Sequence, residues 1–270
     1  MTHQVSIDTG RAVVTKRYRS WSRGEPAREW RALQLLAEYA SGLAAEPLSA
    51  ALDASPPTIV MSWLPGEQLG TVPVSPAQAR ALARALDWLW RSVPAERLAD
   101  SGRTIANSTA FTRQVRTALP ARHELGDDPL VRRACAAATA WLDSGALDVQ
   151  AGQEDAGLVL GQGDANLANF LWDGRAVYLV DFEDSGASDR AFELAGLVEH
   201  ISAWPGGILE AAGFLALFEL TAAEQARLLE FRRLAALFWL IFLRPGSKAS
   251  SRNPPGTLQR QADRLLTLLG

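Results

Sequence analysis

Three side chains with oxygen donors lie close together in the second half of the sequence and form its most informative segment. Asp164 and Asn169 fall within residues 159–172, and Asp181 follows the apolar run 178–180. Two carboxylates and an amide oxygen are hard ligands of the kind that Mg²⁺ prefers in proteins. Such a set suits an ion that bridges nucleotide phosphates, with one carboxylate left to orient a hydroxyl nucleophile. The segment therefore predicts magnesium-dependent phosphoryl transfer.

Short apolar runs are expected to hold these residues in place. Residues 159–160, 170–172 and 176–180 have the composition of strands, and the Asp173-Gly174 pair between the last two runs is a hairpin signal. The sequence thus predicts a hairpin that brings both aspartates and the asparagine to the same end of one small sheet.

The rest of the chain divides into a strand-rich part and a helical part. A β-hairpin is predicted over residues 1–18, a helix over 25–45 and a buried strand over 58–63, before a Pro-Gly linker at 64–67. Helices are predicted over 76–92, 108–118, 128–143, 189–203, 207–218, 221–242 and 258–269. We therefore expect an α+β protein with a small lobe, residues 1–64, and a large helical lobe, residues 65–270, with a ligand cleft between them.

Composition excludes several classes of protein. The chain has 270 residues, 48% of them apolar, and a formal net charge of −3, which gives no reason to expect nucleic acid or membrane as a partner. The single cysteine, Cys135, excludes an internal disulfide framework and is expected to be a core residue. No apolar run is long enough for a membrane span, and the N-terminus lacks the features of a signal peptide. We expect a cytoplasmic monomer or homodimer that acts on a small molecule.

Two motifs carry a resemblance to a known family. The run Gln162-Gly-Asp-x-x-x-x-Asn169 followed by Val180-Asp-Phe-Glu183 is similar to the catalytic loop and the metal motif of aminoglycoside phosphotransferases and choline kinases. Three further segments, Asp189–Ala195, Met61–Glu67 and Val14–Lys16, resemble that family's next helix start, its hinge and its lysine-bearing strand, in the same order. The resemblance implies a protein-kinase-like fold with two lobes and an activity on a small molecule.

The resemblance also implies a role for each candidate residue. Asp164 would accept or orient the proton of the substrate hydroxyl, while Asn169 and Asp181 would hold Mg²⁺ against the phosphates of ATP. Lys16 would reach the α- and β-phosphates and would be held by an ion pair with Glu29. The backbone near Ser62–Leu64, with Met61 and Trp63 beside it, would contact the adenine, and Glu183 and Asp184 would touch a second metal ion or the acceptor.

Each assignment has a structural alternative. Asp164 and Asn169 are also common turn formers, Lys16 also fits a solvated strand position, and Glu25 competes with Glu29 as the partner of the lysine. Four acidic residues, Glu183, Asp184, Glu193 and Glu199, either attract an amino-bearing substrate or form solvated surface. The nine tryptophans fit a core better than a cage for a cationic substrate, and His200 fits a core or surface position better than a catalytic one.

Two departures from the family pattern affect the expectation. The family's histidine at the start of the catalytic loop is Gln162 here, which still donates and accepts hydrogen bonds and is expected to support the loop. In addition, no Gly-x-Gly loop precedes Lys16, so the phosphates would lack a lid of backbone N–H donors. Either a strand and a glycine loop lie upstream of Met1, or nucleotide binding is weaker than is usual in the family.

The sequence thus predicts an ATP-dependent, Mg²⁺-dependent phosphotransferase that acts on a hydroxyl of a small molecule such as an aminoglycoside, an amino alcohol or a sugar. The sequence is compatible with either ATP or GTP as the phosphoryl donor. Two alternatives stay open: a catalytically weak, kinase-like module that binds a small molecule, and, with less support, a helical scaffold for protein partners.

Overall fold

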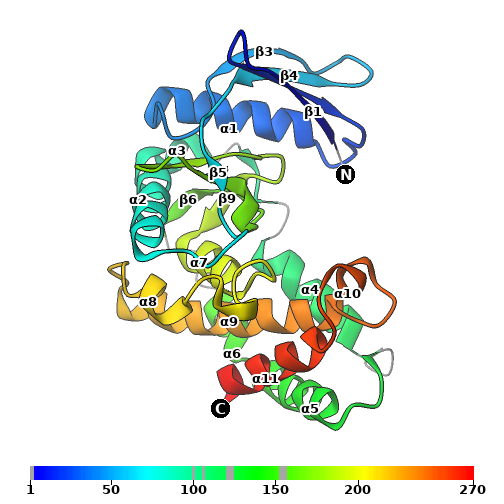
Figure 1. Ribbon diagram of the computed structural model, residues 1–270. Coiled ribbons are helices and arrows are strands. Elements are labelled where there is room, and N and C mark those ends of the chain that lie inside the picture. The colour runs from blue at the N-terminus through cyan, green and yellow to red at the C-terminus, as the bar shows by residue number, and fades with distance from the viewer. Residues whose placement is uncertain (1–2, 99–100, 105–106, 120–124, 152–156) are drawn as a thin grey trace.

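The computed structural model describes residues 3–98, 101–104, 107–119, 125–151 and 157–270. Figure 1 shows a small sheet at one end of the molecule, two smaller sheets in the middle and a group of helices at the other end. This α+β architecture, with a small antiparallel N-terminal sheet and a largely helical remainder, is the predicted one.

A four-stranded antiparallel sheet forms the N-terminal end, in the order β1-β2-β4-β3. Its strands are β1 His3–Asp8, β2 Val13–Tyr18, β3 Pro47–Ala51 and β4 Thr58–Ser62. The helix α1, Glu25–Tyr39, has Pro26 in its first turn and lies along one face of this sheet. It ends six residues before the predicted boundary at 45, where the chain turns at Gly42 into β3, a strand that the sequence analysis missed.

Two smaller sheets lie next to the N-terminal part. The predicted hairpin is present as β7, Phe170–Trp172, and β8, Val177–Leu179, but the prediction of one sheet for all three apolar runs was wrong. The first run forms β6, Leu158–Gly161, which pairs with the unpredicted β9, Gly186–Asp189. The predicted linker also contains a strand, because β5, Glu67–Gln68, pairs with β7.

Helices make up most of the remaining chain. They are α2 Pro76–Ser92, α3 Ala95–Leu98, α4 Ser108–Ala118, α5 Pro129–Asp143, α6 Ala146–Ala151, α7 Arg190–Glu199, α8 Ala211–Leu215, α9 Ala222–Phe242, α10 Lys248–Arg252 and α11 Thr257–Leu269. Local capping explains several of these boundaries. Asp189 caps α7, and Thr221 and Glu224 form a capping box at the start of α9. The predicted helix over 207–218 is shorter, because Gly206 and Gly207 have positive φ and Glu210 caps a new start at Ala211.

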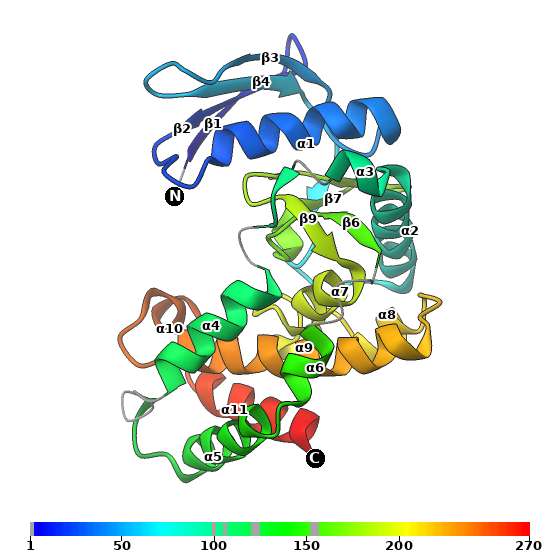
Figure 2. The ribbon, with the colours of Figure 1, turned by 180° about the vertical axis from the view of Figure 1, so that it is seen from behind.

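The core of the helical part is formed where α7 crosses α9 (Figure 2). Leu194 and Val198 of α7 and Leu234 and Leu237 of α9 have no measurable exposure. Cys135 is buried in α5, as predicted. Within the described ranges, none of the helices combines the length and the apolar character that a bilayer span requires. The predicted division at residues 64 and 65 stays a prediction, although β4 ends next to it at Ser62.

Candidate active site

The catalytic-loop candidates lie between β6 and β7 and are joined by hydrogen bonds. Asn169, at the end of a short 3₁₀ turn (Leu167–Asn169), donates from Nδ2 to Oδ2 of Asp164 at 3.1 Å and to its carbonyl at 3.3 Å. Asp164 also accepts from the backbone N–H of Asn166. Because the amide nitrogen of Asn169 faces Asp164, its oxygen is directed elsewhere and is left for another partner. Burial raises the pKa of Asp164 from its usual value, and the bond from Asn169 opposes that shift.

Asp181 follows β8 in an unusual backbone conformation. Its φ is 66°, which is uncommon for a residue other than glycine and is typical of functional sites. Gln162 braces this point, since its Nε2 donates to the carbonyl oxygen of Val180 at 2.6 Å. The backbone of Gln162 is held in turn by the buried carboxylate of Glu193 in α7. Gln162, which occupies the position of the family's histidine, therefore lies where it can support the catalytic loop.

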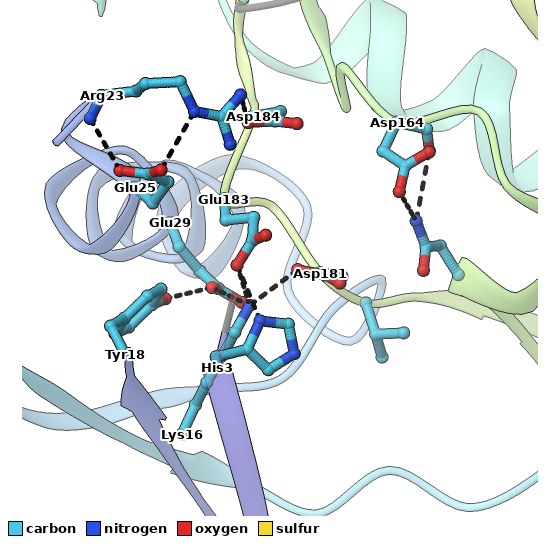
Figure 3. Close-up of polar contacts among 12 residues, drawn as sticks. His3, Lys16, Tyr18, Arg23, Glu25, Glu29, Asp164, Asp181, Glu183 and Asp184 are labelled. Atoms are coloured by element: carbon cyan, nitrogen blue, oxygen red, sulfur yellow. Dashed lines mark hydrogen bonds and ion pairs between the residues drawn. The ribbon is translucent and has the colours of Figure 1, made fainter. Parts of the chain in front are cut away.

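Lys16 in β2 lies at the centre of a group of carboxylates, which Figure 3 shows converging on its ammonium. The Nζ atom lies 2.6 Å from Glu29, 2.6 Å from Asp181 and 3.1 Å from Glu183. Burial alone would lower the pKa of Lys16, but these three carboxylates outweigh it and raise the pKa well above its usual range. The predicted pair with Glu29 is present, and the hydroxyl of Tyr18 donates a hydrogen bond to the same carboxylate. Glu25, the competing candidate, pairs with Arg23 instead.

The structure adds His3 to this group, a residue that the sequence analysis did not single out. Its Nδ1 lies 2.8 Å from Glu183, a contact across 180 positions of the chain. His3, Asp181 and Glu183 have ligand atoms within 4.8 Å of one another. The ammonium of Lys16 contacts both of these carboxylates, so a cation already occupies this cluster. Hard oxygen donors suited to Mg²⁺ remain on the other oxygen of Asp181 and on the amide oxygen of Asn169.

A cavity of about 360 Å³ opens beside these residues and is lined by the strands of the N-terminal sheet. Lys16, Met61, Trp63, Asn169 and Asp181 all line it, so the structure brings the predicted metal and nucleotide residues to one place. Some of the backbone N–H groups of the adjoining segment, residues 62–64, are already used in hydrogen bonds within the protein. Those of Ser62 and Trp63 donate to carbonyls of the chain itself, and of residues 62–64 only the N–H of Leu64 has no partner among the described residues.

A second cavity, of about 410 Å³, lies on the other side of the catalytic loop and contains Asp164 and Asp184. Asn169 lines the first cavity, and it donates a hydrogen bond to Asp164, which lines the second. The catalytic loop therefore lies between the two cavities. Asp184 lies 3.3 Å from Arg23, which comes from the loop before α1 (Figure 3). Burial raises the pKa of Asp184 to about 6, and Arg23 opposes this shift.

Glu193 and Glu199, two of the predicted acidic residues, already have partners within the protein and are not free charges in either cavity. Glu193 accepts from Ser188 and from the backbone of Gln162, and burial raises its pKa. Glu199 is fully buried between Arg232 and Arg264. Of the two alternatives given for these residues, solvated surface is therefore excluded for Glu199, and the partly exposed Glu193 is held by partners within the protein. Neither His3 nor Arg23 had a local signal in the sequence for its place in the site, since Glu183 and Asp184, which they contact there, lie more than 150 positions away.

Comparisons with known proteins identify the family and the fold of the chain. The model of the phosphotransferase enzyme family matches residues 2–234 of the chain. No curated protein matches significantly.

Several solved structures share the fold at low identity. A GDP complex of a mutant aminoglycoside 2′-phosphotransferase-IIIa has a TM-score of 0.67 at 17% identity, with 100% of this chain and 87% of that chain covered. A choline/ethanolamine kinase family protein from Mesorhizobium loti has a TM-score of 0.64 at 17% identity, with 99% and 84% covered. An aminoglycoside phosphotransferase from Alicyclobacillus acidocaldarius has a TM-score of 0.65 at 17% identity, with 99% and 87% covered.

Proposed function

The chain belongs to the phosphotransferase enzyme family, and we propose that it transfers the γ-phosphoryl group of ATP to a hydroxyl group of a small molecule. One observation carries the proposal. A pair of hydrogen-bonded residues, Asp164 and Asn169, lies between two cavities, with Lys16 and Asp181 on one side. The first cavity would hold the nucleotide and the second the acceptor. Solved relatives of the same fold contain ADP with spectinomycin and AMP-PNP with hygromycin B.

In the proposed reaction the acceptor hydroxyl attacks the γ-phosphorus while the bond from that phosphorus to the β,γ-bridging oxygen breaks, which releases ADP. The proton of the hydroxyl passes to the carboxylate of Asp164, whose raised pKa makes it a better base than an ordinary aspartate. Lys16 would offset charge on the phosphates, and Glu29 would fix its position. When bound, Mg²⁺ would neutralise further charge, held by Asp181 and Asn169.

Direct measurement of turnover tests the proposal. Wild type is expected to consume ATP, or GTP if the donor preference differs, only when an alcohol from a chemically diverse panel is present. Asp164→Asn and Asp181→Asn are each expected to lower this turnover by about 100-fold or more. Asp53→Asn, which changes an exposed aspartate that lines neither cavity, is the matched control and should retain wild-type turnover. Equal turnover in all four proteins would contradict the mechanism.

The second candidate is a module that binds a small molecule without transferring phosphate. It is favoured by the commitment of the Lys16 ammonium to three carboxylates, which leaves little of its charge for phosphates. A ligand that binds only the native state raises the melting temperature. Stabilisation by an alcohol, with none by Mg·ATP or Mg·GTP, would select this candidate over the kinase.

A further inference from the structure

A third cavity lies where α2, the start of α7 and the turn after α8 meet. Its volume of about 410 Å³ is in the range of sites for small organic molecules. None of the residues that line it lines either of the two cavities beside the catalytic loop. A molecule bound here would therefore occupy a place of its own, apart from the proposed nucleotide and acceptor.

Positive charge exceeds negative charge in the lining of this third cavity. Four guanidinium groups and two carboxylates line it, from Arg80, Arg84, Arg91, Arg190, Asp87 and Glu219. The whole chain has the opposite balance, with 27 lysines and arginines against 30 aspartates and glutamates. The excess of positive charge is thus local, and it favours an anionic ligand.

Two of the four arginines are paired within the protein. Arg91 pairs with Asp87 at 2.8 Å. Arg190 lies 3.8 Å from Asp87 and 3.3 Å from Glu224, which lies outside the lining. The Nε atom of Arg190 is nevertheless buried without a hydrogen-bond partner among the described residues, so one of its donors is unused. Asp87 and Glu224 are occupied by these contacts, so neither neutralises the other two arginines.

Arg80 and Arg84 carry the unbalanced charge. Both are exposed, and neither side chain has an ion-pair or hydrogen-bond partner among the described residues. They are one helical turn apart on α2, where two like charges repel each other. The opposite face of α2 is buried through Leu82 and Leu86, which keeps both arginines on the open side. Of the described lining residues, only Glu219 is an unpaired carboxylate that opposes an anion.

The rest of the lining is apolar and consists of Ala83, Leu217 and Phe218. Phe218 packs against Arg190, whose guanidinium lies 5.8 Å from the ring centroid. Leu217 is 42% exposed, and a ligand that covers it would remove apolar area from water. A guanidinium binds phosphate and carboxylate through two parallel N–H bonds. The cavity therefore fits a molecule that has an apolar body beside a compact group of two negative charges.

We propose that the third cavity binds a small organic dianion, a phosphate ester or a dicarboxylate, with its charged group at Arg80 and Arg84 and its apolar body against Leu217. The inference is independent of the proposed function, because the ligand binds outside both cavities of the candidate active site and needs no nucleotide.

Isothermal titration calorimetry of the full chain, without nucleotide or Mg²⁺, tests the inference directly. At about pH 8 the probes phenyl phosphate and isophthalate each carry about two negative charges, whereas benzoate carries one and benzyl alcohol none. At least one of the two dianions is expected to bind about tenfold or more tightly than benzoate, and benzyl alcohol more weakly still. The tighter of the two dianions identifies phosphate or dicarboxylate as the group that the cavity recognises.

Substitutions in the lining locate the bound dianion. Arg80→Gln and Arg84→Gln are each expected to weaken its binding by about tenfold, because each removes a charged donor. Arg113→Gln removes the same charge from an exposed arginine of α4 outside this cavity, so it is the matched control and should bind within about twofold of wild type. Glu219→Gln removes the opposing carboxylate and should tighten binding by about twofold to threefold.

The apolar contact has a variant of its own. Leu217→Ala is expected to weaken the aromatic dianion by about threefold, because less apolar area is covered. Leu229→Ala truncates a leucine of similar exposure on α9, outside the cavity, and should leave the affinity unchanged. The melting temperature of every variant is expected to stay within a few degrees of wild type, since all the substituted side chains are exposed. A loss of binding is then distinguished from a loss of folding.

The inference is overturned if neither dianion binds wild type at concentrations up to about 10 mM, or if neither binds more tightly than benzoate. Equal losses in Arg84→Gln and Arg113→Gln would also overturn it, because they would show only a general attraction of anions to positive surface. Phosphoryl transfer enters none of these measurements. Failure of the proposed function would therefore leave the inference intact, and absence of dianion binding would leave the proposed function intact.

Discussion

Lys16 illustrates how charge balance at a single residue decides the behaviour of this site. It is one of only two lysines in the chain, and it is 3% exposed. A buried ammonium is costly, yet three carboxylates within 3.1 Å keep its pKa high and the group charged. The same contacts fix the position of the ammonium relative to Asp181. A substitution at Lys16 can therefore change the position of the charge as well as remove it.

A conservative substitution separates charge from position. Lys16→Arg keeps a positive charge against Glu29, so the melting temperature should stay within a few degrees of wild type. The guanidinium is larger and planar, so it cannot occupy the same point, and transfer is expected to fall by about 100-fold. Lys248→Arg changes the other, exposed lysine and should alter neither quantity. A fully active Lys16→Arg protein would contradict the proposed role.

His200 makes a prediction about stability and pH. Burial lowers its pKa from the usual 6.5 to about 4. As the pH falls from 6.5, the unfolded chain takes up this proton before the folded protein does, so the contribution of His200 to stability is present above pH 6.5 and is lost towards pH 4. The loss is at most about 3 kcal/mol.

Chemical unfolding of wild type and His200→Gln between pH 7.5 and 4.5 measures this contribution. The difference in unfolding free energy between the two proteins should shrink as the pH falls, because glutamine does not titrate. The buried carboxylates Asp164 and Glu193, whose pKa values are raised, titrate in both proteins and cancel in the comparison. A difference that is constant with pH would show that His200 is not buried in its neutral form.

At the scale of elements, the turn before Asp164 depends on a glycine. Gly163 has φ of 81°, and a Cβ there would overlap the carbonyl oxygen of Asp184. Gly163→Ala is therefore expected to cost more than the roughly 1 kcal/mol of a strained φ and to displace the loop. Gly174, in the β7–β8 turn, has φ of 97° and open space around its Cβ position.

Gly174→Ala is accordingly a matched control that carries the backbone strain without the clash. We expect it to lower the melting temperature by a few degrees and to keep transfer activity, while Gly163→Ala loses both more stability and most of the activity. Thermal unfolding followed by a turnover assay distinguishes the two variants. Similar behaviour of both would mean that Asp184 moves aside.

A helix or strand could be predicted when the interactions that determine it lie close together along the chain. The starts of α2, α7 and α9 were predicted because a hydroxyl or carboxylate within three residues of each N-terminus satisfies the free N–H groups. The strands β5 and β9 were missed because they are short and their partners lie 103–105 and 25–31 positions away. Small and polar residues such as those of β9 carry no alternation that indicates a strand.

The candidate site divides in the same way. The arrangement of Asp164, Asn169 and Asp181 could be predicted from their spacing in the sequence, because one loop and one hairpin set their relative positions. The contacts of His3 with Glu183 and of Arg23 with Asp184 were not, because each joins the N-terminal part to the segment after β8. The aromatic side chains that line the second cavity could not be predicted as a group either, because they come from three helices and helical spacing alone favours a core.

At the scale of the whole molecule, one buried carboxylate joins three helices. Glu199, at the end of α7, accepts from Arg232 of α9 at 2.8 Å and pairs with Arg264 of α11. It is fully buried, whereas the two arginines are about one-fifth exposed. The neighbouring His200 belongs to the wall of the second cavity, so the same junction positions a residue of the site.

Removal of this charge should therefore affect stability far more than an exposed pair does. Glu199→Gln leaves two arginines without their carboxylate in a partly buried place, and we expect a loss of about 2–4 kcal/mol in the free energy of unfolding. Glu38→Gln breaks a pair with Arg97 in which both side chains are about half exposed, and should cost at most about 1 kcal/mol. Urea unfolding of both variants at low and at high salt provides the measurement. The loss in Glu199→Gln should persist in salt because buried charges are little screened, and that in Glu38→Gln should disappear. Equal and salt-sensitive losses would show that the junction of α7, α9 and α11 is held by apolar packing alone.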